Sequence, residues 1–220
     1  MTATYNIPAS ENNLVWYAGY GSNLSRTRFD CYIHGGTPAG STRPCPGCRD
    51  KTPPRADRQV TLPHQLYFAA QSVRWGGAVA FIRPTRSKAA TYARMYLITY
   101  GQFNDVVRQE NDRKVPGDII VPPYVELAKA TEWQIAHVRL YGRLMKVGVE
   151  GEHPILTFSA TRDNFTLGPP REAYVRVIVS GLEETYPAMC ESQILEYLAH
   201  AEGIRGLLDP DALACFLFGP

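Results

Sequence analysis

An apolar segment that ends in a short polar corner is the first feature of this chain with potential for chemistry. Residues 14–20 are apolar and aromatic, which is typical of a buried strand, and Gly21-Ser22-Asn23 follows just before an expected helix. The first backbone N–H groups of a helix have no partner within it. Gly19 and Gly21 lack the Cβ atoms that would keep a ligand away from this backbone, and the helix dipole adds partial positive charge. The corner is therefore predicted to bind a carboxylate, oxyanion or phosphate, although a simple capped turn explains the same residues.

A carboxylate at the end of a second expected helix is the other candidate. The segment 101–110 contains three apolar residues spaced at i, i+3 and i+4, namely Phe103, Val106 and Val107. Glu110 at i+7 shares their face, so its carboxylate is expected to point toward the core. The residues expected off this face are Asp105, Arg108 and Gln109. An inward carboxylate suits a proton shuttle, whereas the alternative is a glutamate that turns to solvent or pairs with Arg113 or Lys114.

Several segments of the chain resemble the gamma-glutamylcyclotransferase superfamily. Tyr20-Gly21-Ser22-Asn23-Leu24 is similar to its Tyr-Gly-Ser-Asn signature. Later segments resemble further elements of that family and come in the same order. They are a glycine-containing strand (75–80), the strand and helix that end in the family's catalytic glutamate (96–110), a late strand (153–158) and two helices (172–181 and 192–198). The resemblance implies an α+β fold, a small mixed β-barrel with flanking helices, formed by one domain over residues 1–220.

The resemblance also implies a reaction, an intramolecular acyl transfer. The α-amine of a γ-glutamyl group attacks its own side-chain carbonyl, which releases 5-oxoproline and an amine or amino acid. Glu110 would carry the proton from the α-ammonium group to the leaving amine. The residues that would bind the substrate are Tyr20, Gly21, Ser22, Asn23 and Leu24. This chemistry needs no metal or organic cofactor, and the implied partner is a small γ-glutamyl compound.

The same fold leaves two other functions open. One is a non-catalytic module that binds a small molecule, and the other is a related acyl transferase or amide hydrolase. Three departures from the family pattern bear on the substrate. Asn111 follows Glu110 where the family often has glycine, Phe158 replaces a tyrosine that some members have, and residues 36–60 resemble an insertion near the pocket.

A structural zinc site is a further alternative. Cys31-x-x-His34 and Cys45-x-x-Cys48 have the pairwise spacing of zinc ligands, but Cys31 also suits a core position and the second pair suits a tight turn. The chain has five cysteines, an odd number in a chain too large to need disulfides, so reduced thiols are expected.

Composition is that of an ordinary globular enzyme. With 220 residues, 45% of them hydrophobic and 20% charged, the chain can bury one substantial core. A net charge of +2 argues against a dominant nucleic-acid surface. Residues 1–13 form a polar segment expected to be a tail, and no apolar run is long enough for a signal sequence or membrane helix, so a cytoplasmic protein is expected. No pattern indicates an oligomeric state.

The elements that must position these residues follow from periodicity and from turn-forming residues. Further strands are expected at 65–70, 78–82, 94–100, 134–147 and 155–158. Helices are expected from Asn23 to about Ile33, over 101–110 and in most of 171–218. The segment 118–131 is ambiguous, because Pro122-Pro123 interrupts a potential helix at 124–129. The segment 35–54 is rich in Gly, Pro, Ser, Thr and Arg, and is predicted to be a long surface loop. Its arginines and those just after it are expected to be solvated, namely Arg43, Arg49, Arg55 and Arg58.

Overall fold

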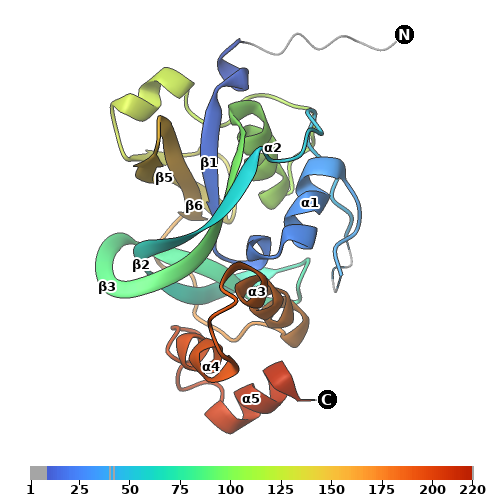
Figure 1. Ribbon diagram of the computed structural model, residues 1–220, viewed down its shortest axis with the longest axis vertical. Coiled ribbons are helices and arrows are strands. Elements are labelled where there is room, and N and C mark those ends of the chain that lie inside the picture. The colour runs from blue at the N-terminus through green and yellow to red at the C-terminus, as the bar shows by residue number, and fades with distance from the viewer. Residues whose placement is uncertain (1–8, 40, 42, 220) are drawn as a thin grey trace.

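The computed structural model describes residues 9–39, 41 and 43–219 (Figure 1). In this part of the chain the strands are β1 (Leu14–Gly19), β2 (Ala56–Ser72), β3 (Gly77–Thr99), β4 (Glu132–Gln134), β5 (Tyr141–Glu150) and β6 (His153–Ala160). The α-helices are α1 (Arg26–His34), α2 (Tyr100–Glu110), α3 (Glu172–Thr185), α4 (Glu191–Ala199) and α5 (Pro210–Phe218). Three short 3₁₀ helices accompany them, namely η1 (Ala9–Asn12), η2 (Ser22–Leu24) and η3 (Tyr124–Ala128).

The strands form one mixed sheet in the order β2-β3-β1-β6-β5-β4. Strands β1 and β6 are parallel, and the other neighbouring pairs are antiparallel. The predicted α+β class is confirmed. The predicted barrel is not: among the described residues β2 and β4 are the two edges of an open sheet. The β2–β3 ladder contains register shifts, which bend strands, and Figure 1 shows β3 curving round without closing the sheet.

The β2–β3 hairpin is much longer than the predicted strands. Residues 56–60, assigned to the insertion at 36–60, belong to β2, and residues 83–93 continue β3. Backbone ladder bonds pair these segments although many of their side chains are exposed and polar, so they lack the apolar pattern that predicts strands. The expected strand 134–147 is also divided, because residues 135–140 lie outside β4 and β5.

Two segments that were expected at the surface, the tail at 1–13 and the loop at 35–54, are more closely packed than expected. Of the expected polar tail 1–13, residues 1–8 lie outside the described residues, and residues 9–12 form η1, whose Glu11 is buried. In the segment 35–54, the side chains of Cys45 and Cys48 are buried against the core. Gly47 has a φ of +86° and lies so close to Gly35 that a Cβ there would be 2.8 Å from the Gly35 nitrogen. Glycine at 47 therefore lets the loop pack onto the end of α1.

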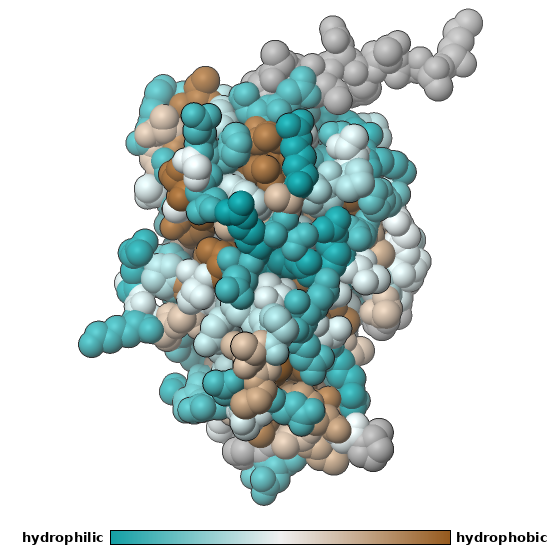
Figure 2. All heavy atoms as spheres, viewed as in Figure 1, coloured by the Kyte–Doolittle hydropathy of each residue, from teal (hydrophilic) through white to brown (hydrophobic). Residues whose placement is uncertain are grey.

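The helices lie around the sheet, with α4 and α5 at the lower end of Figure 1. Helix α3 packs on η2 at Gly181, where a Cβ would be 2.4 Å from the Ser25 nitrogen. Hydrophilic residues gather across the middle of the face in Figure 2, over β2 and β3. Arg94 of β3 pairs with Asp57 of β2 and with Glu184 of α3, so ion pairs join the hairpin to the helix. No helix in the described residues is both long and apolar enough to cross a membrane.

Candidate functional site

A cavity of about 300 Å³ lies where the corner after β1 meets the C-terminal end of α2. Tyr20, Gly21, Ser22 and Asn23 line it together with Glu110, so the fold brings the two candidate segments together. The fifth predicted binding residue, Leu24, is not on these walls. Its side chain is fully buried, and a Cβ on Gly181 of α3 would meet it at 2.5 Å.

The corner is built differently from the expected helix start. Residues 22–24 form η2, and α1 then begins after Ser25, whose Oγ accepts a hydrogen bond from the Arg28 N–H. The N-cap is therefore Ser25 and not Ser22 or Asn23. The first bonds of η2 run from Leu24 N to Gly21 O and from Ser25 N to Ser22 O. The side chains of Ser22 and Asn23 are thus available to other partners.

Asn23 connects the corner directly to Glu110. Its Nδ2 donates to Glu110 Oε1 at 2.9 Å and to the Tyr17 hydroxyl at 2.8 Å. The Oδ1 atom of Asn23 is buried and has no hydrogen-bond partner among the described residues. Glu110 makes no ion pair within the same part of the chain, so the expected alternative of a pair with Arg113 or Lys114 is absent there. An amide therefore orients its carboxylate, and no salt bridge to it forms among the described residues.

Helix α2, which carries Glu110, is enclosed on all sides. The residues expected off its apolar face, Asp105, Arg108 and Gln109, are also buried, with exposed fractions of 1%, 7% and 3%. They are buried because the loop after α1 and the segment after α2 cover the polar side of the helix. Gln109 shows this directly: its Nε2 donates to Tyr32 O at 3.0 Å, and its Oε1 accepts from Gly47 N at 3.2 Å.

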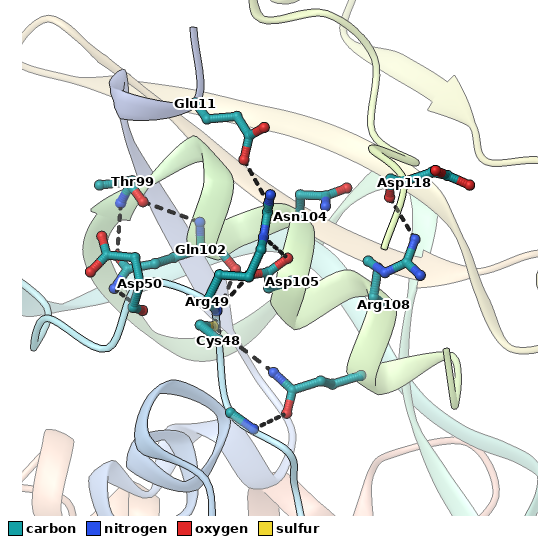
Figure 3. A network of polar contacts seen from close by, with 12 residues as sticks. Glu11, Cys48, Arg49, Asp50, Thr99, Gln102, Asn104, Asp105, Arg108 and Asp118 are labelled. Carbon is teal, nitrogen blue, oxygen red and sulfur yellow. Dashed lines mark hydrogen bonds and ion pairs between the residues drawn. The ribbon is translucent and has the colours of Figure 1, made fainter. Parts of the chain in front are cut away.

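Figure 3 shows the polar network that holds α2. Arg49 of the loop donates from its backbone N and its Nε to Asp105, and its guanidinium reaches Glu11 of η1 at 2.6 Å. Arg108 donates to the carbonyl oxygens of Lys114 and Asp118. At the start of α2, Thr99 and Gln102 form a capping box. Because these bonds reach α2 from the loop before it, from the segment after it and from its N-cap, they hold both ends of the helix in place.

Asn111, one of the departures from the family pattern, ends α2 and holds the next wall of the cavity. Its Nδ2 donates to the carbonyl oxygens of Val107 and Tyr141, and its Oδ1 accepts from Tyr141 N at 3.1 Å. Tyr141 begins β5 and lines the cavity. An asparagine at this position therefore joins the end of α2 to β5.

Tyr20 is among the predicted binding residues, but the tyrosine hydroxyls in the cavity walls were not predicted from the sequence. Burial, with the charge of Glu110 adding to it, raises the pKa of Tyr17 well above its ordinary value, and burial raises the pKa of Tyr20 in the same way. The Tyr20 hydroxyl donates to Phe158 O at 2.8 Å, and the Tyr174 hydroxyl accepts from Ala80 N at 3.1 Å. These hydroxyls stay protonated at neutral pH. Their strand and helix positions indicate core residues equally well, so the sequence carries no signal that separates them.

Phe158, another of the three departures, is part of the aromatic wall. Its ring stacks on Tyr17 with centroids 5.3 Å apart and planes at 12°. The ring supplies packing at this position but no hydrogen bond to a ligand.

Of the two cysteine-containing pairs, Cys45 and Cys48 pack the loop against the core, whereas the Cys31 thiol donates to Thr27 O within α1 at 3.5 Å. Cys45 Sγ accepts from the Arg28 guanidinium at 3.4 Å, and Cys48 Sγ donates to Gln102 O at 3.7 Å. All five cysteines are free. Within the described residues, no group of three or more His, Cys, Asp or Glu side chains is placed to hold a metal ion. The zinc alternative therefore has no support in this part of the chain.

Comparison with solved structures shows the class of fold, which is that of gamma-glutamyl cyclotransferase. A structure of a protein described as gamma-glutamyl cyclotransferase matches 93% of this chain and 98% of its own, with a TM-score of 0.50 and 14% identity. An uncharacterized protein from Homo sapiens matches 92% of this chain and 98% of its own, with a TM-score of 0.48 and 16% identity. At these identities the likeness concerns the fold alone.

Sequence comparison finds a relative of different description. Histone deacetylase 5 of Arabidopsis thaliana is 38% identical in an alignment 188 residues long, which covers 77% of this chain and 28% of that protein. The chain therefore spans little more than a quarter of the length of this relative. No protein-family model matches the chain.

Proposed function

We propose that this chain is an enzyme of the gamma-glutamylcyclotransferase type, which cyclises a γ-glutamyl group to 5-oxoproline and releases the amine or amino acid bound to it. One observation carries the proposal. The Glu110 carboxylate, held by Asn23 at 2.9 Å, lies on the wall of a cavity that also includes the Gly21-Ser22 corner. A proton carrier and an anion-binding backbone thus face the same space.

The geometry supports the following sequence of steps. Glu110 accepts a proton from the α-ammonium group, and the freed nitrogen forms a bond to the γ-carbonyl carbon. The carbonyl oxygen takes up negative charge, which backbone N–H groups of the corner stabilise. When the intermediate collapses, the bond to the leaving nitrogen breaks as Glu110 returns the proton to it, and the new ring nitrogen gives up its second excess proton to the released amine, which departs as an ammonium group. The hydrogen bond from Asn23 orients the Glu110 carboxylate for this proton transfer.

Glycine at two positions shapes this corner. A Cβ at position 19 would lie 2.8 Å from Asn23 Cβ, so Gly19 lets Asn23 approach β1 and reach Glu110. A Cβ at position 21 would lie 2.9 Å from the Tyr174 hydroxyl and 3.4 Å from Ala80 Cβ. Because Gly21 has no side chain, the backbone of the corner stays accessible to a ligand between the walls that Tyr174 and Ala80 form.

The proposal is tested by measuring 5-oxoproline release by the purified protein from a panel of γ-glutamyl amines, amino acids and peptides. Product from at least one compound supports the enzyme. If no compound yields product while some still bind, the non-catalytic binding module gains support. Release of free glutamate in place of 5-oxoproline would instead indicate an amide hydrolase.

Substituting Gly21 tests the corner by itself. Gly21→Ala is expected to raise KM for the γ-glutamyl substrate about tenfold, because the new methyl group presses on the Tyr174 hydroxyl at the cavity wall. Steady-state kinetics of 5-oxoproline release measure the effect. The matched variant carries Tyr174→Phe in addition, which removes the atom that the methyl group meets and should restore part of the affinity. An unchanged KM in Gly21→Ala would remove the corner from substrate binding.

A further inference from the structure

We infer that the leaving amine belongs to an acidic peptide, whose carboxylates bind in two basic clefts that open from the Glu110 cavity. This inference rests on the proposed function and specifies its substrate. Two observations support it: the cavity shares walls with two neighbouring clefts, and these walls carry several cationic side chains.

The first cleft, here called the Arg162 cleft, has a volume of about 650 Å³ and shares Gln71, Arg139 and Leu140 with the Glu110 cavity. The second, the Lys114 cleft, has a volume of about 490 Å³ and shares Arg74, Gln109 and Asp112 with it. The cavity of about 300 Å³ suits a γ-glutamyl group, and both clefts continue from its walls. A leaving group longer than one residue would extend into one of them.

The walls of the cavity and the two clefts are strongly basic. Six cationic side chains lie on them, namely Arg43, Arg74, Arg113, Lys114, Arg139 and Arg162. The carboxylates on the same described walls are Glu110 and Asp112, and Asp112 lies 3.9 Å from Arg43. A chain with a net charge of only +2 thus concentrates positive charge around this site.

Most of these cations have no acidic partner. Apart from Arg43, none of the six makes an ion pair within the residues that the structure describes. Arg74 donates to Arg43 O at 2.9 Å, and Arg113 donates to His137 O at 2.6 Å, so carbonyl groups fix their position without neutralising their charge. Fixed guanidinium groups of this kind suit carboxylates, which they bind with paired N–H donors.

The clefts fit a peptide better than a nucleic acid. Single-stranded nucleic acids bind on exposed aromatic rings on which their bases stack. The aromatic ring in the Arg162 cleft, Phe165, is covered by the Arg162 guanidinium at 4.9 Å, and the described walls of the Lys114 cleft contain no aromatic residue. The ligand class is therefore a peptide with carboxylate side chains.

The test compares two peptides of equal length, γ-Glu-Gly-Glu-Glu and γ-Glu-Gly-Gln-Gln, both with an amidated C-terminus. The acidic peptide is expected to have a kcat/KM for 5-oxoproline release about tenfold higher at low salt, and the ratio should fall as salt is added. Arg139→Gln and Arg74→Gln should each lower the ratio. Lys88→Gln, which removes an exposed cation of β3 away from these walls, should leave the ratio unchanged.

The outcomes separate this inference from the function on which it rests. Equal kcat/KM values for the two peptides, or a ratio that Arg139→Gln and Arg74→Gln do not change, would overturn the acidic substrate while the cyclotransferase stands. If a single-stranded oligonucleotide inhibits turnover of both peptides equally at low salt, and the enzyme has no preference between the two peptides, the clefts would bind nucleic acid. This result would also overturn the acidic substrate. No 5-oxoproline from either peptide or from any γ-glutamyl amine would overturn the proposed function and this inference together.

Discussion

Replacing Glu110 with glutamine is expected to lower kcat for 5-oxoproline release by about 10²-fold or more, with little change in substrate affinity or fold. Glutamine has the same shape, and its Oε1 can still accept the hydrogen bond from Asn23 Nδ2. It cannot accept the proton of the α-ammonium group. The loss should therefore fall on the chemical step, and it is measured from kcat and KM of both proteins with the best γ-glutamyl substrate.

A matched substitution separates charge loss at the site from charge loss in general. Glu183→Gln changes an exposed glutamate on α3 and should leave kcat unchanged. Equal thermal unfolding midpoints of the two variants and the original protein would show that the fold is intact. Undiminished turnover in Glu110→Gln would exclude Glu110 as the proton carrier.

The strand and the helix that carry the site could be predicted because each has a strong local pattern. Residues 14–19 are almost continuously apolar, and all but the first are buried in β1 at the centre of the sheet. Helix α2 shows the spacing of Phe103, Val106 and Val107, whose side chains are fully buried. Both patterns depend on residues a few positions apart, which is the range over which periodicity is informative.

The contact at the centre of the site has no local pattern. Asn23 and Glu110 are 87 residues apart, and they meet because β1 pairs with β3, which leads directly into α2. The resemblance to a known family placed both residues in the site, whereas periodicity indicated only the inward direction of Glu110. The tyrosine hydroxyls of the walls and the role of Asn111 depend on the same tertiary pairing.

The burial of the polar side of α2 could not be predicted, for a related physical reason. A helix with one apolar stripe is expected to expose its opposite face to solvent. Here the loop at 35–54, which composition assigns to the surface, supplies Arg49 and the Gly47 N–H as partners for that face. The sequence shows an arginine in a loop rich in glycine and proline, and this is normally a solvated residue. Only its partners, Asp105 and Glu11, explain why it is largely buried.

This network predicts a large loss of stability when Asp105 is removed. Asp105→Ala should lower the free energy of unfolding by about 3 kcal/mol, because Arg49 loses three hydrogen bonds to a carboxylate that is 1% exposed and keeps only Glu11. Urea unfolding followed by circular dichroism measures the change. Glu126→Ala breaks an exposed pair with Lys129 and should cost less than about 1 kcal/mol.

A double substitution distinguishes the ion pair from simple loss of packing. If Asp105 and Arg49 act through each other, the combined variant Asp105→Ala/Arg49→Ala should be more stable than the sum of the two single losses implies, by about 1 to 3 kcal/mol. Asp105 would then stabilise the protein by holding Arg49, and through it the loop and η1, against the helix that ends in Glu110. Additive losses would instead show that each side chain stabilises α2 on its own.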